Sequence, residues 1–329
     1  ATTKDVENAT SAINGDIGML WMLLSGILVF FMQAGFTLVE TGMTRSKNAA
    51  NIAMKHLLDI CVRSLTYWLV GYSLMYGETS NGWFFWSGLF QGEGADLFFQ
   101  TMFAATTATI VSGAIAGRTK YSTYIIFSLV MTAIIYPISG GWEWNGGWLN
   151  NTDGIMPAEF IDFAGSSIVH SVGGWAALVA AFMVGPRIGK YVNGKVLPIP
   201  GHNQILATLG VFILWLGWFG FNGGSQLALG SVADASAMAR IFCNTNLAAA
   251  GGVIVAMILS QLLYKKVDLT FVLNGALGGL VSITAEPLTP TFLSAMLIGG
   301  TGGALVMLAV PLLDKLKIDD VVGAIPVHL

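Results

Sequence analysis

Asp162-Phe-Ala-Gly165-Ser-Ser-Ile-Val169-His170 recurs 158 residues later in this 329-residue sequence as Asp320-Val-Val-Gly323-Ala-Ile-Pro-Val327-His328. Both copies read D-x-x-G-x-x-x-V-H, and each stands at the start of an apolar segment. From aspartate to histidine is eight residues, which is about 12 Å along a helix. If the two copies enter the protein from opposite sides, their histidines should meet inside it.

The composition indicates that this repeat lies in lipid. Hydrophobic residues make up 54% of the chain, charged residues only 10%, and the mean hydropathy is +0.70. Soluble domains carry about a quarter charged residues, so this chain has too few charges to cover a water-facing surface. A net charge of −3 gives no reason to expect a nucleic-acid partner.

Apolar stretches of membrane-spanning length recur along the whole chain. About 20 residues cross the hydrocarbon core, and in lipid such stretches must be helical because their backbone polar groups have no water to bind. We predict nine complete spans, at 17–39, 52–76, 97–117, 121–142, 163–184, 204–221, 241–264, 269–285 and 288–313. A tenth begins near Ile318 and is about half present at Leu329, so we expect the chain to be cut within it. The class is therefore an all-α polytopic membrane protein.

Basic residues set the expected orientation. Eleven of the fifteen lie in alternate connections, namely Arg45, Lys47, Arg118, Lys120, Arg187, Lys190, Lys195, Lys265, Lys266, Lys315 and Lys317. Cytoplasmic loops are rich in such residues, which predicts cytoplasmic odd-numbered loops and an outer N-terminus. The segments that begin at Asp162 and Asp320 then run in opposite directions. This predicts inverted repeats at approximately 17–184 and 204–329, as many transporters have, with two imidazoles near the midplane.

Three interpretations of His170 and His328 remain open from the residues alone. They are a satisfied core pair, two axial ligands of a haem, or the polar lining of a conducting path, in which neutral imidazoles donate and accept hydrogen bonds. We favour the lining, because ionisable groups inside a membrane usually face a cavity or one another. His56 and His202 look incidental, at a span entrance and in a polar loop.

The remaining candidates also have structural explanations. Asp162 can cap a helix start or help to hold a cation in an outer vestibule. Trp142, Trp144 and Trp148 can form an interfacial belt, or a Trp face can bind a cation. Glycines in 217–225 can bring Phe221 and Ser225 to a lumen, or can serve helix packing alone.

Other patterns predict packing and exclude chemistry. Gly113-x-x-x-Gly117 and Gly275-x-x-x-Gly279 favour close helix contacts. Cys61 and Cys243 fall within apolar spans and are expected to be free buried thiols. No H-E-x-x-H or C-x-x-C spacing suggests a metal site, and no nucleophile–base pattern emerges. We therefore predict no cofactor and no enzyme activity.

Taken together, the motifs resemble one known family over nearly the whole chain, the ammonium transporters (the Amt/MEP/Rh superfamily), and within it the bacterial Amt branch. Besides the two histidine segments, the anchors are Phe31-Met-Gln-Ala-Gly35, Thr44-Arg-Ser-Lys-Asn48 and Gly217-Trp-Phe-Gly-Phe-Asn222. The resemblance implies one transmembrane domain over 1–329, with the family's eleven helices in inverted five-helix repeats. Nine complete helices and part of the tenth would be present. It also implies a homotrimer in the inner (plasma) membrane.

The resemblance further implies a site and a mechanism. Trp144, Ser225 and Phe103 match the outer ammonium recruitment site, and Phe99 matches an aromatic residue of that outer region. Asp162 matches the acidic residue near the vestibule. Phe103 and Phe221 match a stacked aromatic gate, and His170 and His328 match the twin pore histidines.

The implied function is capture of ammonium, its deprotonation and conduction of ammonia. The alternative is an ammonium sensor that signals to a cytoplasmic regulatory protein or a fused domain. Glu143 and Asn145 make the loop around Trp144 more polar than the family pattern.

Overall fold

Helices form nearly all of the regular structure in the computed structural model, which describes residues 2–150 and 157–329. In chain order they are α1 (Thr3–Met43), a 3-10 turn (Ser46–Asn48), α2 (Ala49–Thr66), a π-helical turn (Tyr67–Gly71), α3 (Tyr72–Tyr76), α4 (Gly94–Ala114), α5 (Tyr121–Val130), a π-helical turn (Met131–Ile135), α6 (Tyr136–Trp144), a π-helical turn (Ser166–Ser171), α7 (Val172–Val184), α8 (Gln204–Gly224), α9 (Val232–Tyr264), α10 (Leu269–Ile283), α11 (Phe292–Lys315) and α12 (Ala324–His328). Strands β1 (Tyr191–Val192) and β2 (Lys195–Val196) pair antiparallel around Asn193-Gly194, a common two-residue hairpin turn.

The predicted spans are confirmed as helices. Each of the nine corresponds to one helix, or to helical segments joined by a π-helical turn. Within the described residues, seven segments are long and apolar enough to cross a membrane, and α10 is apolar but shorter. The second span, α2 to α3, differs from the others because Lys55, Asp59 and Arg63 lie on α2.

Two helices begin earlier than predicted. The expected starts were residues 17 and 241, whereas α1 begins at Thr3 and α9 at Val232. Each begins with a capping box, Thr2 with Asp5 and Ser231 with Asp234. A capping box supplies partners for backbone N–H groups at the helix start, so these helices extend beyond their apolar stretches.

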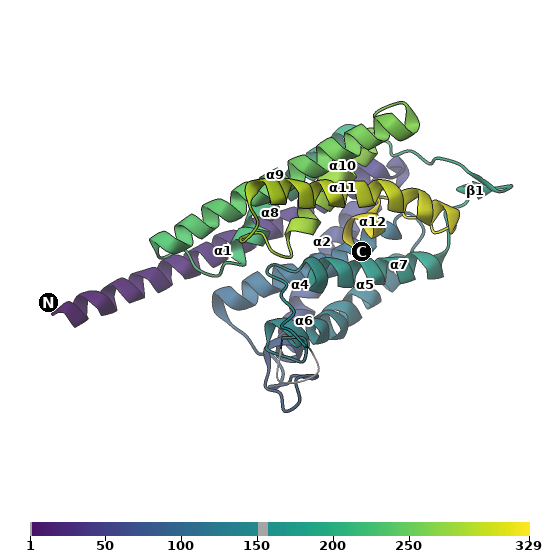
Figure 1. The fold of residues 1–329 in the computed structure, drawn as a ribbon. Coiled ribbons are helices and arrows are strands. Elements are labelled where there is room, and N and C mark those ends of the chain that lie inside the picture. Colours follow the sequence, from purple (N-terminus) through teal and green to yellow (C-terminus); the bar gives the residue numbers. More distant parts are fainter. Residues whose placement is uncertain (1, 151–156) are drawn as a thin grey trace.

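Helices distant in sequence lie side by side (Figure 1). α1 packs along α8, and α9 packs against both α10 and α11. The short α12 lies in the middle of the bundle, against α4, α7 and α10. The segments that carry the two histidines are therefore neighbours.

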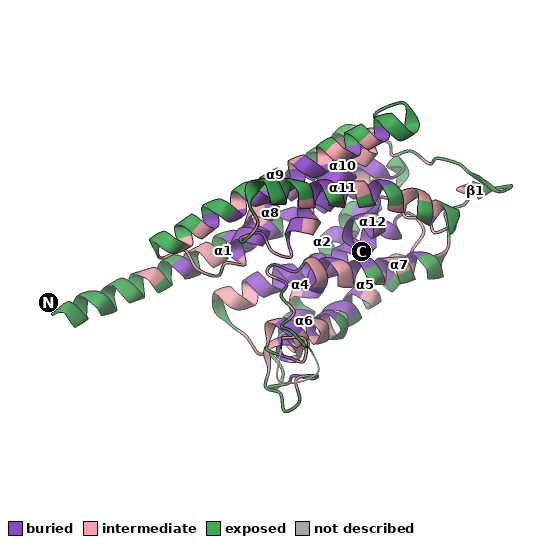
Figure 2. Ribbon diagram, viewed as in Figure 1, coloured by how far each residue is buried: buried purple, intermediate pink, exposed green. Residues whose placement is uncertain are grey.

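The outside of the bundle is apolar. Buried residues line the contacts between helices, and exposed residues face outward (Figure 2). Among the exposed ones are large hydrophobic side chains such as Phe182 at 74% and Met183 at 78%. A water-soluble protein seldom exposes so much contiguous apolar surface, whereas a multi-pass membrane protein presents it to lipid.

The prediction for the two cysteines is half right. Cys61 and Cys243 are free, but both are exposed rather than buried. An apolar helix in lipid has an outward face as well as an inward one, and hydropathy alone does not distinguish the two faces.

Small residues bring the backbones of α9, α10 and α11 together. A Cβ atom added at Gly252 would lie 2.1 Å from the carbonyl oxygen of Gly275, and one at Gly279 would lie 2.5 Å from that of Ala248. The packing predicted for the second glycine pair is thus confirmed. The first pair is different: Gly113 faces the side chain of Val322, but Gly117 lies beyond the end of α4.

This close packing predicts the effect of adding a side chain at Gly252. Gly252→Val should destabilise the protein by about 1–3 kcal/mol, because overpacking forces backbones apart. Gly15→Ala is the matched control, since a Cβ there meets nothing within 4 Å. Thermal unfolding in detergent measures both variants, and equal midpoints for the two would contradict the prediction.

Candidate functional site

The carboxylate of Asp162 holds the start of the first histidine helix. It accepts four backbone N–H bonds: Oδ1 from Gly165 (3.0 Å) and Ser166 (2.8 Å), and Oδ2 from Ser167 (2.7 Å) and Ile168 (2.8 Å). Asp162 is 1% exposed. The capping expected of this residue is therefore present, and its two oxygens are occupied by backbone.

The second copy of the motif repeats this construction. Asp320 accepts the N–H of Gly323 at 3.1 Å and that of Ile325 at 2.6 Å. Gly165 and Gly323 both have left-handed backbone, with φ of 101° and 83°, a conformation that side chains disfavour. The motif thus encodes a capped helix start, which explains why its aspartate and its glycine recur together.

The two histidines meet, as predicted. Nδ1 of His170 lies 3.0 Å from Nδ1 of His328, and the ring planes differ by 13°. His170 is 0% exposed and His328 is 5% exposed. Nε2 of His170 has no hydrogen-bond partner within the described structure. One ring must donate and the other accept in this contact, so the pair shares one proton position between two nitrogens.

Aromatic side chains of α8 surround His170. Trp218 stacks on its ring at 5.1 Å between centroids, and Phe221 lies 5.3 Å away. The indole Nε1 of Trp218 donates to Oγ1 of Thr284 at 2.8 Å. Sequence reasoning missed both Trp218 and Thr284. The three-residue spacing of Trp218 and Phe221, which puts both on one helix face, was the signal available in the sequence.

Three of the predicted outer residues form a continuous aromatic series. Phe103 stacks on Phe221 with centroids 4.2 Å apart, and Phe99 lies 4.7 Å from Phe103. Trp144 meets Phe103 edge-on at 6.1 Å. Phe103 and Phe221 are 1% and 0% exposed, so the rings fill the space on this side of the histidines.

Ser225 and Asp162 adjoin this series through backbone contacts. The Ser225 hydroxyl donates to the carbonyl of Phe221 at 2.9 Å. The indole Nε1 of Trp144 donates to the backbone carbonyl of Asp162 at 2.8 Å, and Glu143 accepts the backbone N–H of Asp162 at 3.1 Å. Trp144 and Glu143 lie at the end of α6 and not in a loop as predicted. The end of this helix thus positions Asp162, a role for Glu143 that sequence reasoning missed.

Trp142, on α6, and Trp148, after its end, belong to a separate cluster. Trp148 stacks on Trp83 at 4.8 Å, and Trp142 lies 5.5 Å from Trp148. Trp142 also donates to the carbonyl of Trp83 at 2.9 Å. Of Trp142, Trp144 and Trp148, Trp144 is the one that contacts the aromatic series.

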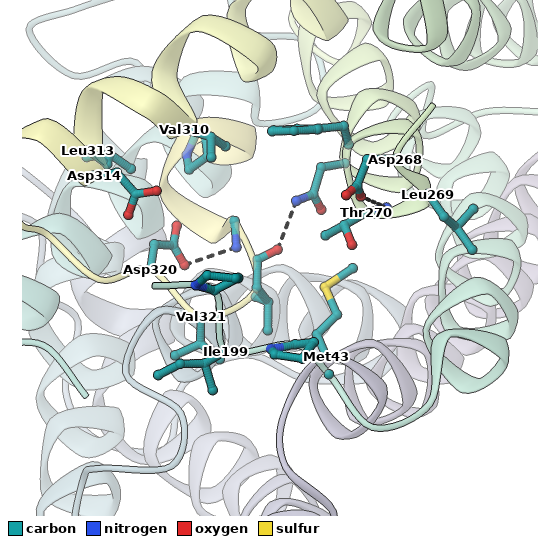
Figure 3. A pocket seen from close by; sticks show the side chains of 18 of the residues that line it. Met43, Ile199, Asp268, Leu269, Thr270, Val310, Leu313, Asp314, Asp320 and Val321 are labelled. Atoms are coloured by element: carbon teal, nitrogen blue, oxygen red, sulfur yellow. Dashed lines mark hydrogen bonds between the residues drawn. The ribbon is translucent and has the colours of Figure 1, made fainter. Parts of the chain in front are cut away.

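Two cavities lie on the other side of the histidines. A small one of about 30 Å³ is lined by His328, Glu40 and Thr109 among others. A large one of about 530 Å³ lies beyond it (Figure 3). Asn274, Val322 and Gly323 line both cavities, and Asn274 donates to the Val322 carbonyl at 3.0 Å.

An ion pair fixes one wall of the large cavity. Arg187 donates to the Asp319 carboxylate from its backbone N–H (2.9 Å), Nε (2.8 Å) and Nη2 (2.8 Å). Burial raises the pKa of this carboxyl, but the hydrogen bonds from Arg187 outweigh burial and leave the pKa below its ordinary value. Asp319 therefore stays charged at neutral pH and ties the 185–190 loop to the α11–α12 linker.

The interpretation of His56 as incidental is wrong. It is 3% exposed, and its Nε2 lies 2.9 Å from Oε2 of Glu40. Glu40 directly follows the first predicted span, 17–39, and lies on α1; an ionisable residue at the edge of an apolar span was itself a signal. His202, in contrast, contacts the backbone carbonyl of Thr44 in the loop region.

The geometry of the histidine pair does not fit the haem interpretation. Two axial haem ligands stand on opposite sides of the iron, whereas these two Nδ1 atoms face each other at hydrogen-bond distance. On one side of the pair, the aromatic series of Phe99, Phe103 and Phe221 reaches His170. On the other side, His328 lines the small cavity. Such an arrangement can pass a small neutral molecule and can hand over a proton, but it offers no full set of ligands to a bare cation.

Comparison with known proteins agrees with this description. The sequence model of the Ammonium Transporter Family matches residues 20–329. A protein of Synechocystis sp. named for ammonium transport (sll1017) is 46% identical over 340 residues, covering 99% of this chain and 75% of its own. Ammonium transporter Amt2 of Archaeoglobus fulgidus is 45% identical over 324 residues, covering 95% and 68%. A solved structure called Sensor Amt Protein superposes with a TM-score of 0.91 at 41% identity, covering 97% and 80%.

The four hydrogen bonds to Asp162 generate a prediction about stability. Asp162→Asn should cost about 2 kcal/mol or more, because hydrogen bonds to a charged group contribute about 1.5–3 kcal/mol each and the amide nitrogen cannot accept. Asp234→Asn is the matched control, since Asp234 also accepts hydrogen bonds at a helix start but is only half-buried. Thermal unfolding in detergent should show a larger loss for Asp162→Asn, and equal losses would contradict the prediction.

Proposed function

The chain belongs to the ammonium transporter family, and from this premise we propose that it takes up ammonium beside Trp144 and conducts ammonia past Phe103, Phe221 and the two histidines. Such a protein is a transporter and not an enzyme. The observation that carries the proposal is the hydrogen-bonded pair of buried imidazoles at the end of a closed aromatic series.

The outer residues suit a cation that is still hydrated. An aromatic face attracts ammonium by about 0.5–2 kcal/mol, and Trp144 and Phe103 together offer a face and an edge. Phe99 backs Phe103, and Ser225 brings a hydroxyl to the end of α8. Because its oxygens are bonded to backbone, Asp162 acts through its negative charge and by holding Trp144, not by direct contact.

The aromatic gate and the histidines favour the neutral molecule. Phe103 and Phe221 overlap closely and are buried, so a passing molecule must displace a ring and lose its water. An unpaired cation pays a large desolvation penalty in such surroundings, while ammonia pays little. We therefore place the loss of the proton between the gate and His170.

The wider arrangement follows the same premise. The alternation of basic residues supports an outer N-terminus and a cytoplasmic large cavity in the inner (plasma) membrane. The matched helix starts at Asp162 and Asp320 support inverted repeats over approximately 17–184 and 204–329. We also propose a homotrimer, whose contacts would cover part of the exposed apolar surface, and a cytoplasmic regulatory partner.

Transport is tested in proteoliposomes. The protein should give an ammonium-dependent internal pH change, and His170→Ala should lower its rate by about 100-fold or more, the contribution typical of a positioned proton-transfer group. Phe221→Ala should alter the rate as well, because it opens the gate. His202→Ala is the matched control, since His202 lies in the loop region. Equal flux with and without protein would contradict the proposal.

A second function is favoured by one observation. The solved structure that superposes with a TM-score of 0.91 is called a sensor, so this chain is also a candidate for ammonium sensing through the same outer site and a signalling partner or fused domain. A sensor should bind ammonium saturably and pass none. Calorimetric binding combined with the flux assay separates the two, because saturable binding without flux supports sensing and flux supports transport.

A further inference from the structure

A group of charged side chains lies buried between α1, α2, α4 and α5, outside the aromatic path. Its ionisable members are Glu40, Lys55, His56, Asp59 and Arg63, and each is at most 8% exposed. Within a bilayer, charges at this depth are costly and usually mark a proton or ion pathway. The group contains one acid and one base in each of two pairs, Glu40 with Lys55 and Asp59 with Arg63.

The Glu40 carboxylate is held on two sides. Lys55 donates to Oε1. His56 Nε2 lies 2.9 Å from Oε2, to which the Ser112 hydroxyl also donates. Both oxygens are therefore oriented by donors from α2 and α4, while Nδ1 of His56 has no partner within the described structure.

The second pair is more enclosed. Arg63 bonds Asp59, the Ala105 carbonyl (2.6 Å) and Tyr124, and Tyr124 donates to Asp59 at 2.7 Å. Neither Asp59 nor Arg63 lines a described cavity. This pair has the character of a structural tie between α2, α4 and α5.

Glu40, in contrast, faces the small cavity next to the histidine pair. It lines the small cavity together with His328, and it is the one carboxylate among the described residues that do so. A cavity of about 30 Å³ is large enough for a water molecule, which needs roughly 10–15 Å³. Because this cavity shares Asn274 and Val322 with the large one, Glu40 stands between the histidine pair and the exit.

We propose that Glu40 is the acceptor of the proton that leaves the histidine pair, and that Lys55, His56 and Ser112 position its carboxylate. The inference rests on the proposed transport of ammonium and extends it to the route of the proton. The shared cavity of His328 and Glu40 is the observation that carries it.

The steps balance as follows. An N–H bond of ammonium breaks, ammonia moves on, and Nε2 of His170 takes the proton. His170 passes its Nδ1 proton to Nδ1 of His328, which releases its own Nε2 proton into the small cavity. The Glu40 carboxylate binds that proton, becomes a carboxylic acid, and then releases it toward the large cavity. Both rings must return to their first tautomers before the next cycle.

Paired substitutions that preserve net charge test this role. Glu40→Gln with Lys55→Met removes the proposed acceptor, and Asp59→Asn with Arg63→Met removes the buried pair that faces no cavity. The full-length protein in proteoliposomes is measured in two ways, by ammonium-dependent current and by the internal pH rise that neutral ammonia produces. The first pair should lower the current by about 100-fold, at the low end of proton-transfer effects, and should give a larger internal pH rise than the wild type, because ammonia then enters without its proton. The second pair should match the wild type in both readouts.

Further variants guard against misfolding and separate the outcomes. Glu40→Asp should retain part of the current, and Glu40→Gln with Lys55→Gln replaces the first pair if that pair does not fold. Equal currents in the two paired variants would overturn the proposal. If the wild-type protein admits ammonia, seen as an internal pH rise, but carries no current, the proposal for Glu40 is overturned and the proposed transport stands. If the wild-type protein admits no ammonia, the proposed function itself is rejected.

Discussion

Backbone N–H groups at a helix start inside a membrane have no water to bind, and the carboxylates of the buried Asp162 and the partly buried Asp320 supply their partners. The rest of the structure depends on this interaction. It allows the first turns before α7 and all of α12 to begin within the protein, each after a glycine with left-handed backbone. Each helix then carries its histidine toward the other. Without the two carboxylates, the N–H groups at the starts of these two helices would lie in an apolar interior without hydrogen-bond partners.

The histidine pair joins two different environments. On one side Phe103 and Phe221 exclude water by stacking, and Trp218 fixes the ring of His170. On the other side a small cavity opens past His328. A proton and a neutral molecule that enter together can therefore leave by different contacts, because an imidazole exchanges protons through its nitrogens while its carbon edge offers only apolar contact. The chemistry proposed for ammonium follows from this difference between ring edge and ring nitrogen.

Charges in this protein are rare and their positions are informative. Most lie in loops, where they set orientation, and the Arg187–Asp319 pair ties two of those loops together. A few lie deep between helices in balanced pairs. Removing a single partner from a buried pair leaves an uncompensated charge, so these pairs are tested by joint substitution. The Glu40–Lys55 and Asp59–Arg63 pairs are chemically alike. They differ in that Glu40 lines the small cavity, whereas Asp59 and Arg63 do not.

The sequence by itself determined the helical class, the positions of the spans and the meeting of His170 with His328, because hydropathy and a repeated motif are properties of the chain. It also indicated Asp162 as a helix cap. It did not reveal the early starts of α1 and α9, the outward direction of Cys61 and Cys243, or the functions of Trp218 and Glu143. His56 was wrongly set aside. The early helix starts come from local capping boxes beyond the apolar stretches, which hydropathy does not detect. The other features depend on which helix faces another, and that is a property of the tertiary structure. Packing brought Glu40 of α1 beside His56 of α2 and next to the cavity of His328, a contact that no periodicity within a single helix encodes.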